Sequence, residues 1–189
     1  MARLPAVLGT DDLPLAELCA ARLDGELVAI GTGWCPVDEP DLPSLRAAAV
    51  APRLPAPLIV ERRSAAWVHG ALPSPPSVTE CCVPHDERVA VRNDPTRSVR
   101  EVAITDVEIV ELGGIRCTSI ERTAFDLLRD AAADDGSTVD VVRALVEIAP
   151  STAERVLDRI ESAHRLPHKA LALRRLAEAV AGTAARPPA

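Results

Sequence analysis

The first third of the chain alternates apolar stretches with turn residues, and this pattern predicts a helix followed by a hairpin. Residues 15–23 place leucines at helical spacing, and Asp24-Gly25 is typical of a helix end. Residues 26–37 alternate as two short strands around a glycine turn. This order is typical of the C-terminal half of a winged helix. Residues 1–14 are too few for the helices that come first in a complete module, so we expect a reduced winged-helix-like unit.

The next stretch predicts linking elements and then a boundary. Residues 44–50 predict an alanine-rich helix, and residues 58–60 predict a short buried strand. Ser64 is a suitable N-cap for a helix that Gly70 ends. The proline-rich connection that follows predicts that residues 1–72 form the winged-helix-like unit with its linking helices.

β-forming residues dominate the middle of the chain, and helical periodicity dominates the end. We expect strands at residues 78–83, 89–91, 99–104, 107–112 and 115–117. The capping box Thr118-x-x-Glu121 predicts a helix that starts after Thr118 and carries an apolar stripe from Ile120 to Ala131. We expect further helices at residues 138–148, 152–163 and 167–181. The predicted fold is therefore α+β, with a mixed or antiparallel sheet and C-terminal helices forming a core over residues 73–181. Residues 182–189 are expected to be a disordered tail.

Composition restricts the class of protein. The 189 residues are 48% apolar and 26% charged, which is ordinary for a globular protein. The net charge of −7 argues against non-specific coating of nucleic acid or membrane. Five cysteines without regular spacing favour a reducing compartment. The sequence contains no run of eighteen apolar residues, so we expect no membrane-spanning helix. We therefore expect a cytoplasmic protein.

Catalytic motifs are missing from the sequence. We find no phosphate-binding loop, no nucleophile elbow and no Asp-x-Asp pair, and the sole lysine, Lys169, is far in sequence from paired carboxylates. Cys81 and Cys82 are adjacent, so on a strand they would point to opposite faces, one buried and one exposed. We predict no catalytic residue, no cofactor and no metal. An enzyme acting on nucleic acid would need Asp106 and Glu108 to converge in space.

Three polar residues stand out beside the apolar patterns. Arg122 precedes Asp126 by four positions at the positive end of its helix, the less favourable order for both pair and dipole. We therefore expect Arg122 to bridge to another element, such as Glu61 or Glu80. If Trp67 faces the core, His69 points to solvent or to a neighbouring surface, where it stabilises the helix end or joins a recognition surface.

Several of these segments resemble one family when they are taken in order. The segments are residues 22–28, 64–70, 100–102, 113–118 and 122–129. Together they resemble the actinobacterial AbiEi-like antitoxins of abortive-infection, type IV toxin–antitoxin systems, over about residues 13–181. The resemblance implies an N-terminal winged helix that represses its operon and a following domain that antagonises a nucleotidyltransferase toxin. It makes His69, Arg122 and Asp126 candidates for interaction.

Two functions follow as hypotheses. The first is a non-enzymatic, antitoxin-like regulator that binds double-stranded DNA, a cognate toxin or both. Its DNA phosphate contacts would be Arg22, Arg62, Arg63, Arg165, Lys169, Arg174 and Arg175. The C-terminal members of this set have a second interpretation, as an ordinary charged outer helix face. The alternative function is a stand-alone interaction or scaffold protein that has lost DNA binding.

Overall fold

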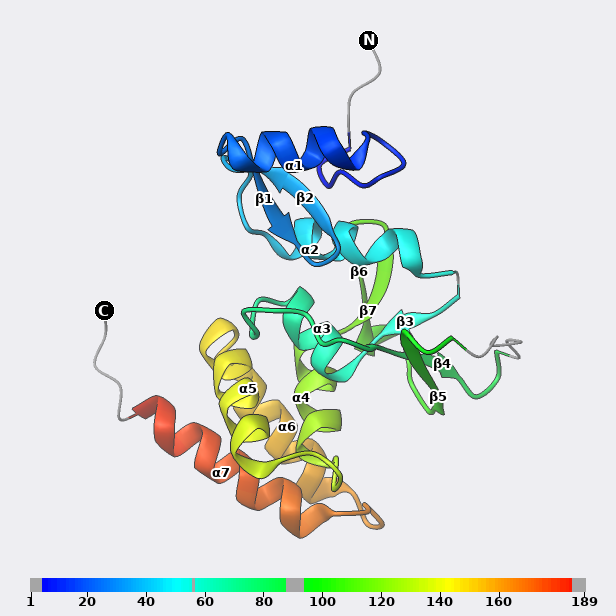
Figure 1. Cartoon of the computed structure of the whole chain (residues 1–189). Coiled ribbons are helices and arrows are strands. Elements are labelled where there is room, and N and C mark those ends of the chain that lie inside the picture. The colour runs from blue at the N-terminus through cyan, green and yellow to red at the C-terminus, as the bar shows by residue number, and fades with distance from the viewer. Residues whose placement is uncertain (1–4, 56, 88–93, 185–189) are drawn as a thin grey trace.

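The computed structural model describes residues 5–55, 57–87 and 94–184. Over these residues it contains seven α-helices, two short 3-10 helices, a five-stranded mixed sheet and a separate two-stranded hairpin. The predicted α+β class is confirmed. Figure 1 shows the hairpin and the first helix at one end of the molecule and the last three helices at the other.

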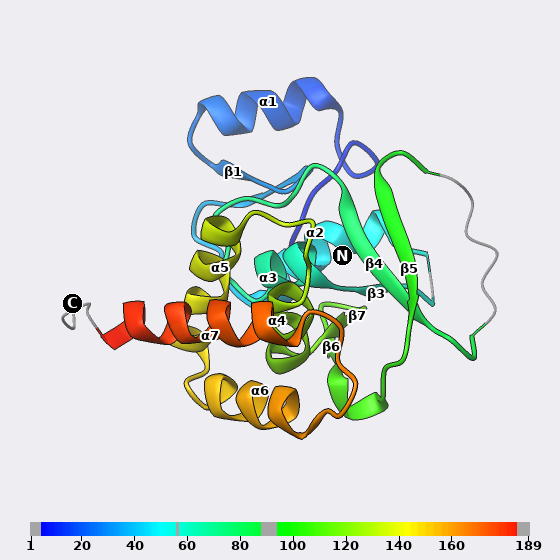
Figure 2. The ribbon, with the colours of Figure 1, turned by 90° about the horizontal axis from the view of Figure 1, so that it is seen from below.

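The N-terminal unit has the predicted order of helix, turn and hairpin. Helix α1 (Leu15–Leu23) is followed by β1 (Leu27–Ile30) and β2 (Gly33–Pro36), which pair as antiparallel strands. The small core of this unit consists of three buried leucines, Leu8, Leu18 and Leu27. Leu18 is the one buried residue of α1, so most of this helix faces solvent. Both views place α1 at the edge of the molecule (Figures 1 and 2).

The five-stranded sheet has the order β5-β4-β3-β7-β6. Its strands are β3 (Ile59–Val60), β4 (Thr79–Pro84), β5 (Arg97–Val102), β6 (Ile109–Leu112) and β7 (Ile115–Thr118). β3 is antiparallel to β4 and parallel to β7, so it is the central strand. The expected boundary between residues 72 and 73 therefore does not separate two packed units. The predicted strand at residues 89–91 lies outside the described residues.

Both faces of the sheet are covered near β4, and this corrects the prediction for its cysteines. Cys81 packs with Leu58 and Val83 on one face, while Cys82 packs with Ile59 and Val102 on the other. Both cysteines are therefore buried. A sequence pattern shows that neighbouring residues face opposite sides of a strand, but it does not show which sides are covered.

Six further helices follow the N-terminal unit along the chain. They are α2 (Pro43–Val50), α3 (Arg62–Val68), α4 (Ile120–Leu128), α5 (Asp135–Ile148), α6 (Ser151–Ser162) and α7 (Lys169–Ala184). Helix α4 contacts α3 on one side and α5, α6 and α7 on the others. Because α7 continues to Ala184, the predicted tail at residues 182–189 begins too early, and residues 185–189 lie outside the described part of the chain. No described helix is long and apolar enough to cross a lipid bilayer.

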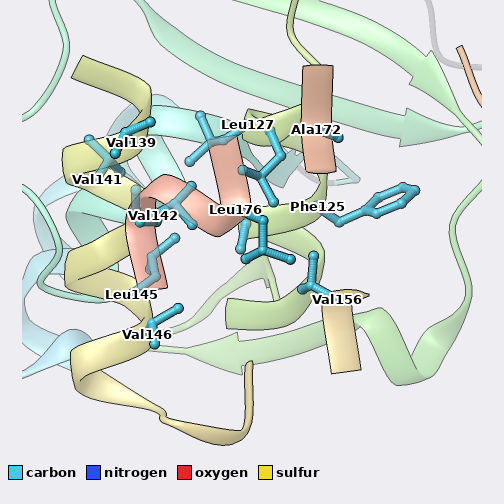
Figure 3. Packing of buried hydrophobic residues seen from close by; sticks show 14 of the residues in the cluster. Phe125, Leu127, Val139, Val141, Val142, Leu145, Val146, Val156, Ala172 and Leu176 are labelled. Atoms are coloured by element: carbon cyan, nitrogen blue, oxygen red, sulfur yellow. The ribbon is translucent and has the colours of Figure 1, made fainter. Parts of the chain in front are cut away.

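The main apolar core lies where these helices meet (Figure 3). Phe125 and Leu127 from α4 pack with Val142 and Leu145 from α5 and with Leu176 from α7. Each such side chain stabilises the fold by roughly 1.5–3 kcal/mol when it is fully buried. This packing fixes the orientation of α4, so the polar residues of the helix face away from this core.

Two predicted helix starts are displaced. Helix α3 begins at Arg62 with Glu61 as N-cap, so Ser64 lies inside the helix. The Ser64 Oγ instead accepts a hydrogen bond of 2.9 Å from the backbone N–H of Glu80, which joins α3 to β4. The N-cap of α4 is Ser119, whose side chain accepts from the N–H of Arg122.

Candidate functional site

Charged residues from three segments meet beside α4 in a buried cluster. Arg100 on β5 binds Glu61 with two hydrogen bonds, Nε to Oε1 at 2.5 Å and Nη2 to Oε2 at 2.7 Å. The same Nη2 donates to Asp126 Oδ2 at 2.9 Å. Both carboxylates are buried. Two parallel N–H donors facing two carboxylate oxygens form the strong, bidentate type of ion pair.

The pKa values in this cluster reflect opposing effects. Burial raises the pKa of the Glu61 carboxyl, and the hydrogen bonds from Arg100 oppose that rise. Burial also lowers the pKa of the Arg100 guanidinium, but Glu61 and Asp126 outweigh it and the net pKa is raised. We treat the contact as a charged pair because its bidentate geometry matches a guanidinium with a carboxylate, and a guanidinium keeps its proton in proteins.

Arg122 extends the cluster to a third carboxylate. Its Nε donates to Asp126 Oδ2 at 2.9 Å, and its Nη1 donates to Glu108 Oε2 at 3.0 Å. The expected bridge from Arg122 to another element is confirmed, but its partner is Glu108 and not Glu61 or Glu80. Burial raises the pKa of Glu108, and the Thr105 N–H with Arg159 and Arg122 lowers it below its ordinary value.

We call the five residues Glu61, Arg100, Glu108, Arg122 and Asp126 the central ion-pair network. Each carboxylate has an arginine partner, so the network holds β5, α4 and the start of α3 together. Asp106, the other carboxylate of the nuclease hypothesis, is exposed. Among the described residues no group of three or more His, Cys, Asp or Glu side chains could hold a metal ion.

His69 is also an internal residue. It is buried, and its Nε2 lies 2.7 Å from the carbonyl oxygen of Thr118. Since a carbonyl can only accept, the Nε2 carries the proton and donates it. Burial lowers the pKa of the His69 imidazole despite this bond. Of the two expected positions for His69, solvent is therefore wrong, because the imidazole is buried against the backbone of Thr118.

Arg175 shows why a cationic pattern does not identify a nucleic-acid surface. Its side chain is 1% exposed and donates to the backbone carbonyls of Asp130 and Ala133 at 2.8 Å each and of Leu128 at 3.2 Å. It also binds the Asp135 carboxylate. Arg175 is therefore enclosed by the α4–α5 connection, and a phosphate cannot reach it.

Four more of the proposed phosphate contacts have internal partners. Arg62 pairs with Asp130 at 3.0 Å, and the Arg63 Nη1 donates to the Ser137 hydroxyl. Lys169 donates from Nζ to two carbonyls at the end of α6, and Arg174 pairs with the carboxylates of Asp135 and Glu178. These four cations therefore stabilise contacts within the protein.

The two remaining cations, Arg22 and Arg165, are exposed and have no hydrogen-bond or ion-pair partner among the described residues. Arg22 is on α1, and Arg165 is in the connection between α6 and α7, so they belong to opposite ends of the molecule (Figure 1). The structure does not bring the seven predicted contacts together on one face.

A different feature distinguishes the N-terminal unit. Residues 5–42 contain eight acidic residues and one basic residue, a net charge of −7 that equals the net charge of the whole chain. All eight carboxylates are exposed: Asp11, Asp12, Glu17, Asp24, Glu26, Asp38, Glu39 and Asp41. Five large apolar side chains are exposed among them: Leu15, Leu23, Val28, Val37 and Leu42. We call this set the N-terminal surface.

A cavity of about 380 Å³ opens beside the N-terminal surface. Val28 and Ile30 from β1 line one side, and Leu45 and Trp67 line the other. Glu39, Asp41 and Arg46 also line the cavity, and Arg46 pairs with Asp41 at 2.6 Å. Its lining is therefore mixed, with apolar side chains beside Glu39 and the Arg46–Asp41 ion pair.

Comparisons with known proteins add a fold likeness only. No family model matches the chain, and no curated protein matches it. Among solved structures, the chain is similar to the crystal structure of the RV2827C protein from Mycobacterium tuberculosis, with a TM-score of 0.47 and 19% sequence identity. The match covers 98% of this chain and 78% of that chain. A likeness at this level carries no inference about function.

Proposed function

We propose that the chain is a non-enzymatic, antitoxin-like binding protein whose N-terminal surface binds a basic protein partner. The observation that carries this proposal is the combination of eight exposed carboxylates with five exposed large apolar side chains on residues 5–42. Exposed apolar groups within one charged region are typical of protein-binding surfaces.

Helix α1 supports the proposal from its packing. Leu18 alone is buried in this helix, while Leu15 is 55% exposed and Leu23 is 88% exposed. A helix of nine residues is too short to be stable by itself in water, so packing must supply most of its stability. A partner seated on α1 would cover its exposed leucines and complete that packing.

Charge favours a protein over DNA as the occupant. DNA carries about one negative charge per 1.7 Å of its axis, and binding it requires cations that replace condensed counterions. Residues 5–42 contain Arg22 as their one basic residue, against eight acidic residues. The same field attracts a basic protein and speeds its association. DNA binding through this unit is thus disfavoured on electrostatic grounds.

The resemblance to AbiEi-like antitoxins suggests which partner to try first. A nucleotidyltransferase must bind the phosphates of a nucleotide, and such sites need cationic side chains. An acidic surface with exposed leucines is complementary to the mouth of such a site. We therefore propose that the partner is a nucleotidyltransferase-type toxin encoded beside this protein.

The experiment is affinity capture from the native cell with paired charge-reversal variants. One variant carries Asp38→Lys and Glu39→Lys on the N-terminal surface, and its control carries Glu147→Lys and Glu154→Lys on α5 and α6. The four residues are all exposed, so both variants keep the fold and change the net charge equally. Captured proteins are quantified by mass spectrometry, and binding is then repeated with the purified partner.

We expect a protein of net positive charge that is captured by the wild type and the control and is at least tenfold depleted with the Asp38 and Glu39 variant. Its purified form should bind less tightly as salt rises. Equal capture by both variants would contradict the proposal. Salt-sensitive binding of the purified protein to promoter DNA would favour a repressor instead.

A further inference from the structure

A second cavity opens at the surface, away from the N-terminal unit, between the start of α3, β5, the end of α4 and the residue that precedes α7. Its volume is about 320 Å³, which is at the small end of the range for small-molecule sites. It is lined by Arg62, Arg100, Asp126, Arg129, Asp130, Ala131, Ala132 and His168. Three arginines thus face two carboxylates in a chain whose net charge is negative.

Arg100 is paired with Glu61 and Asp126, but the other two arginines are incompletely paired. Arg62 binds Asp130 through Nη1, but its Nε is buried and has no hydrogen-bond partner in the described structure. Arg129 has no carboxylate within ion-pair distance among the described residues, and its Nε makes one long contact of 3.4 Å to the Pro167 carbonyl. Its guanidinium lies 4.7 Å from the centre of the Phe125 ring. Donors therefore remain for a ligand.

The electrostatic environment of Arg129 agrees with this geometry. Burial lowers the pKa of its guanidinium, and Asp126 opposes that effect. Arg122, Arg100 and Arg159 then lower the pKa further, so the net direction is downward. Positive charge is therefore in excess around Arg129, and an anion would balance it.

The backbone is strained at two positions of the same cavity. Arg62 has φ of 48° and His168 has φ of 59°, and they are the only two described residues other than glycine with positive φ. Such conformations cost on the order of 1 kcal/mol each or more and are concentrated at ligand sites. His168 also precedes α7, a helix of sixteen residues whose positive dipole end begins here.

We propose that this cavity binds the phosphate group of a small phosphomonoester. The planar donor fork of arginine matches phosphate oxygens, and Arg62, Arg100 and Arg129 present three guanidiniums to one space. The cavity is larger than a phosphate ion, so it also holds part of the group esterified to it. This site is separate from the N-terminal surface and does not depend on the proposed function.

The test is titration of the full chain with inorganic phosphate and with ribose 5-phosphate, at constant ionic strength, by calorimetry. Arg129→Gln removes the least paired guanidinium, and Arg165→Gln makes the same charge change at an exposed residue outside the cavity. Ala131→Glu places a carboxylate at the exposed edge of the cavity without removing any contact of the fold.

We expect saturable binding of both ligands, tighter for ribose 5-phosphate. Binding should weaken at least tenfold in Arg129→Gln and in Ala131→Glu and stay unchanged in Arg165→Gln. If Arg129→Gln does not fold, the change in affinity of Ala131→Glu tests the proposal by itself. The proposal is overturned by non-saturable binding, by equal loss in Arg165→Gln, or by acetate binding as tightly as phosphate. Binding of inorganic phosphate without ribose 5-phosphate would overturn its phosphomonoester part.

Discussion

Replacing Arg175 by alanine should cause a large loss of stability. The substitution removes the donors to the carbonyls of Leu128, Asp130 and Ala133, which Arg175 bonds at 3.2, 2.8 and 2.8 Å. A buried acceptor left without its partner costs about 1–3 kcal/mol. Water that enters the space left by the side chain recovers part of this for some of the carbonyls. We therefore expect a loss of about 3–5 kcal/mol in the free energy of unfolding.

The neighbouring Arg174 provides the matched control. Both arginines bind the Asp135 carboxylate, but Arg174 is exposed and donates to no backbone carbonyl among the described residues. Urea denaturation followed by circular dichroism should show a lower midpoint for Arg175→Ala and almost no change for Arg174→Ala, since exposed ion pairs contribute little. Equal midpoints for the two variants would refute the enclosed role of Arg175.

Three further predictions concern single residues. Because burial depresses the pKa of His69, the unfolded chain takes up a proton first as pH falls below about 6.5, and stability should then decrease by up to about 1.4 kcal/mol per pH unit. His69→Gln should abolish this decrease in denaturation curves measured from pH 7 to 5, and an unchanged slope would contradict the assignment. Gly113 has positive φ, and a Cβ there would collide with the Ser44 carbonyl, so Gly113→Ala should destabilise by about 2 kcal/mol or more. Gly114→Ala, which meets no atom, should cost less in the same thermal scans. Cys19 alone should react rapidly with a thiol reagent, because the other four cysteines are buried; fast labelling of a second thiol in the folded protein would contradict the packing.

Local patterns were sufficient for most elements of the fold. The helix and hairpin of the N-terminal unit and the helices after residue 119 were predicted because their periodicity and turn residues are local. The domain boundary was not predictable in this way. The place of β3 at the centre of the sheet depends on pairing with strands more than twenty and fifty residues away, which no local pattern records.

The candidate site was predicted in part. The order of Arg122 and Asp126 on α4 correctly indicated a bridge to another element, but its partner Glu108 depends on how the chain returns to α4. Arg100 at the centre of the ion-pair network was missed as a site residue, because a single arginine on a strand has no pattern of its own.

The N-terminal surface could have been found from the sequence. Eight acidic residues and one basic residue in residues 5–42 are an imbalance that can be counted in the sequence. The exposure of the leucines among them was not predictable, since helical spacing on α1 is typical of a buried stripe and Leu18 alone is buried.

The most direct test of the proposed function is photo-crosslinking in the native cell from two positions. Leu23 on α1 and Val107 beside β6 are both 88% exposed. A photoreactive amino acid at either position should therefore give the same background of non-specific crosslinks. Position 23 should give a discrete crosslink to a basic protein, and position 107 should not. Crosslinks to DNA from position 23, or the same products from both positions, would contradict a protein-binding N-terminal surface.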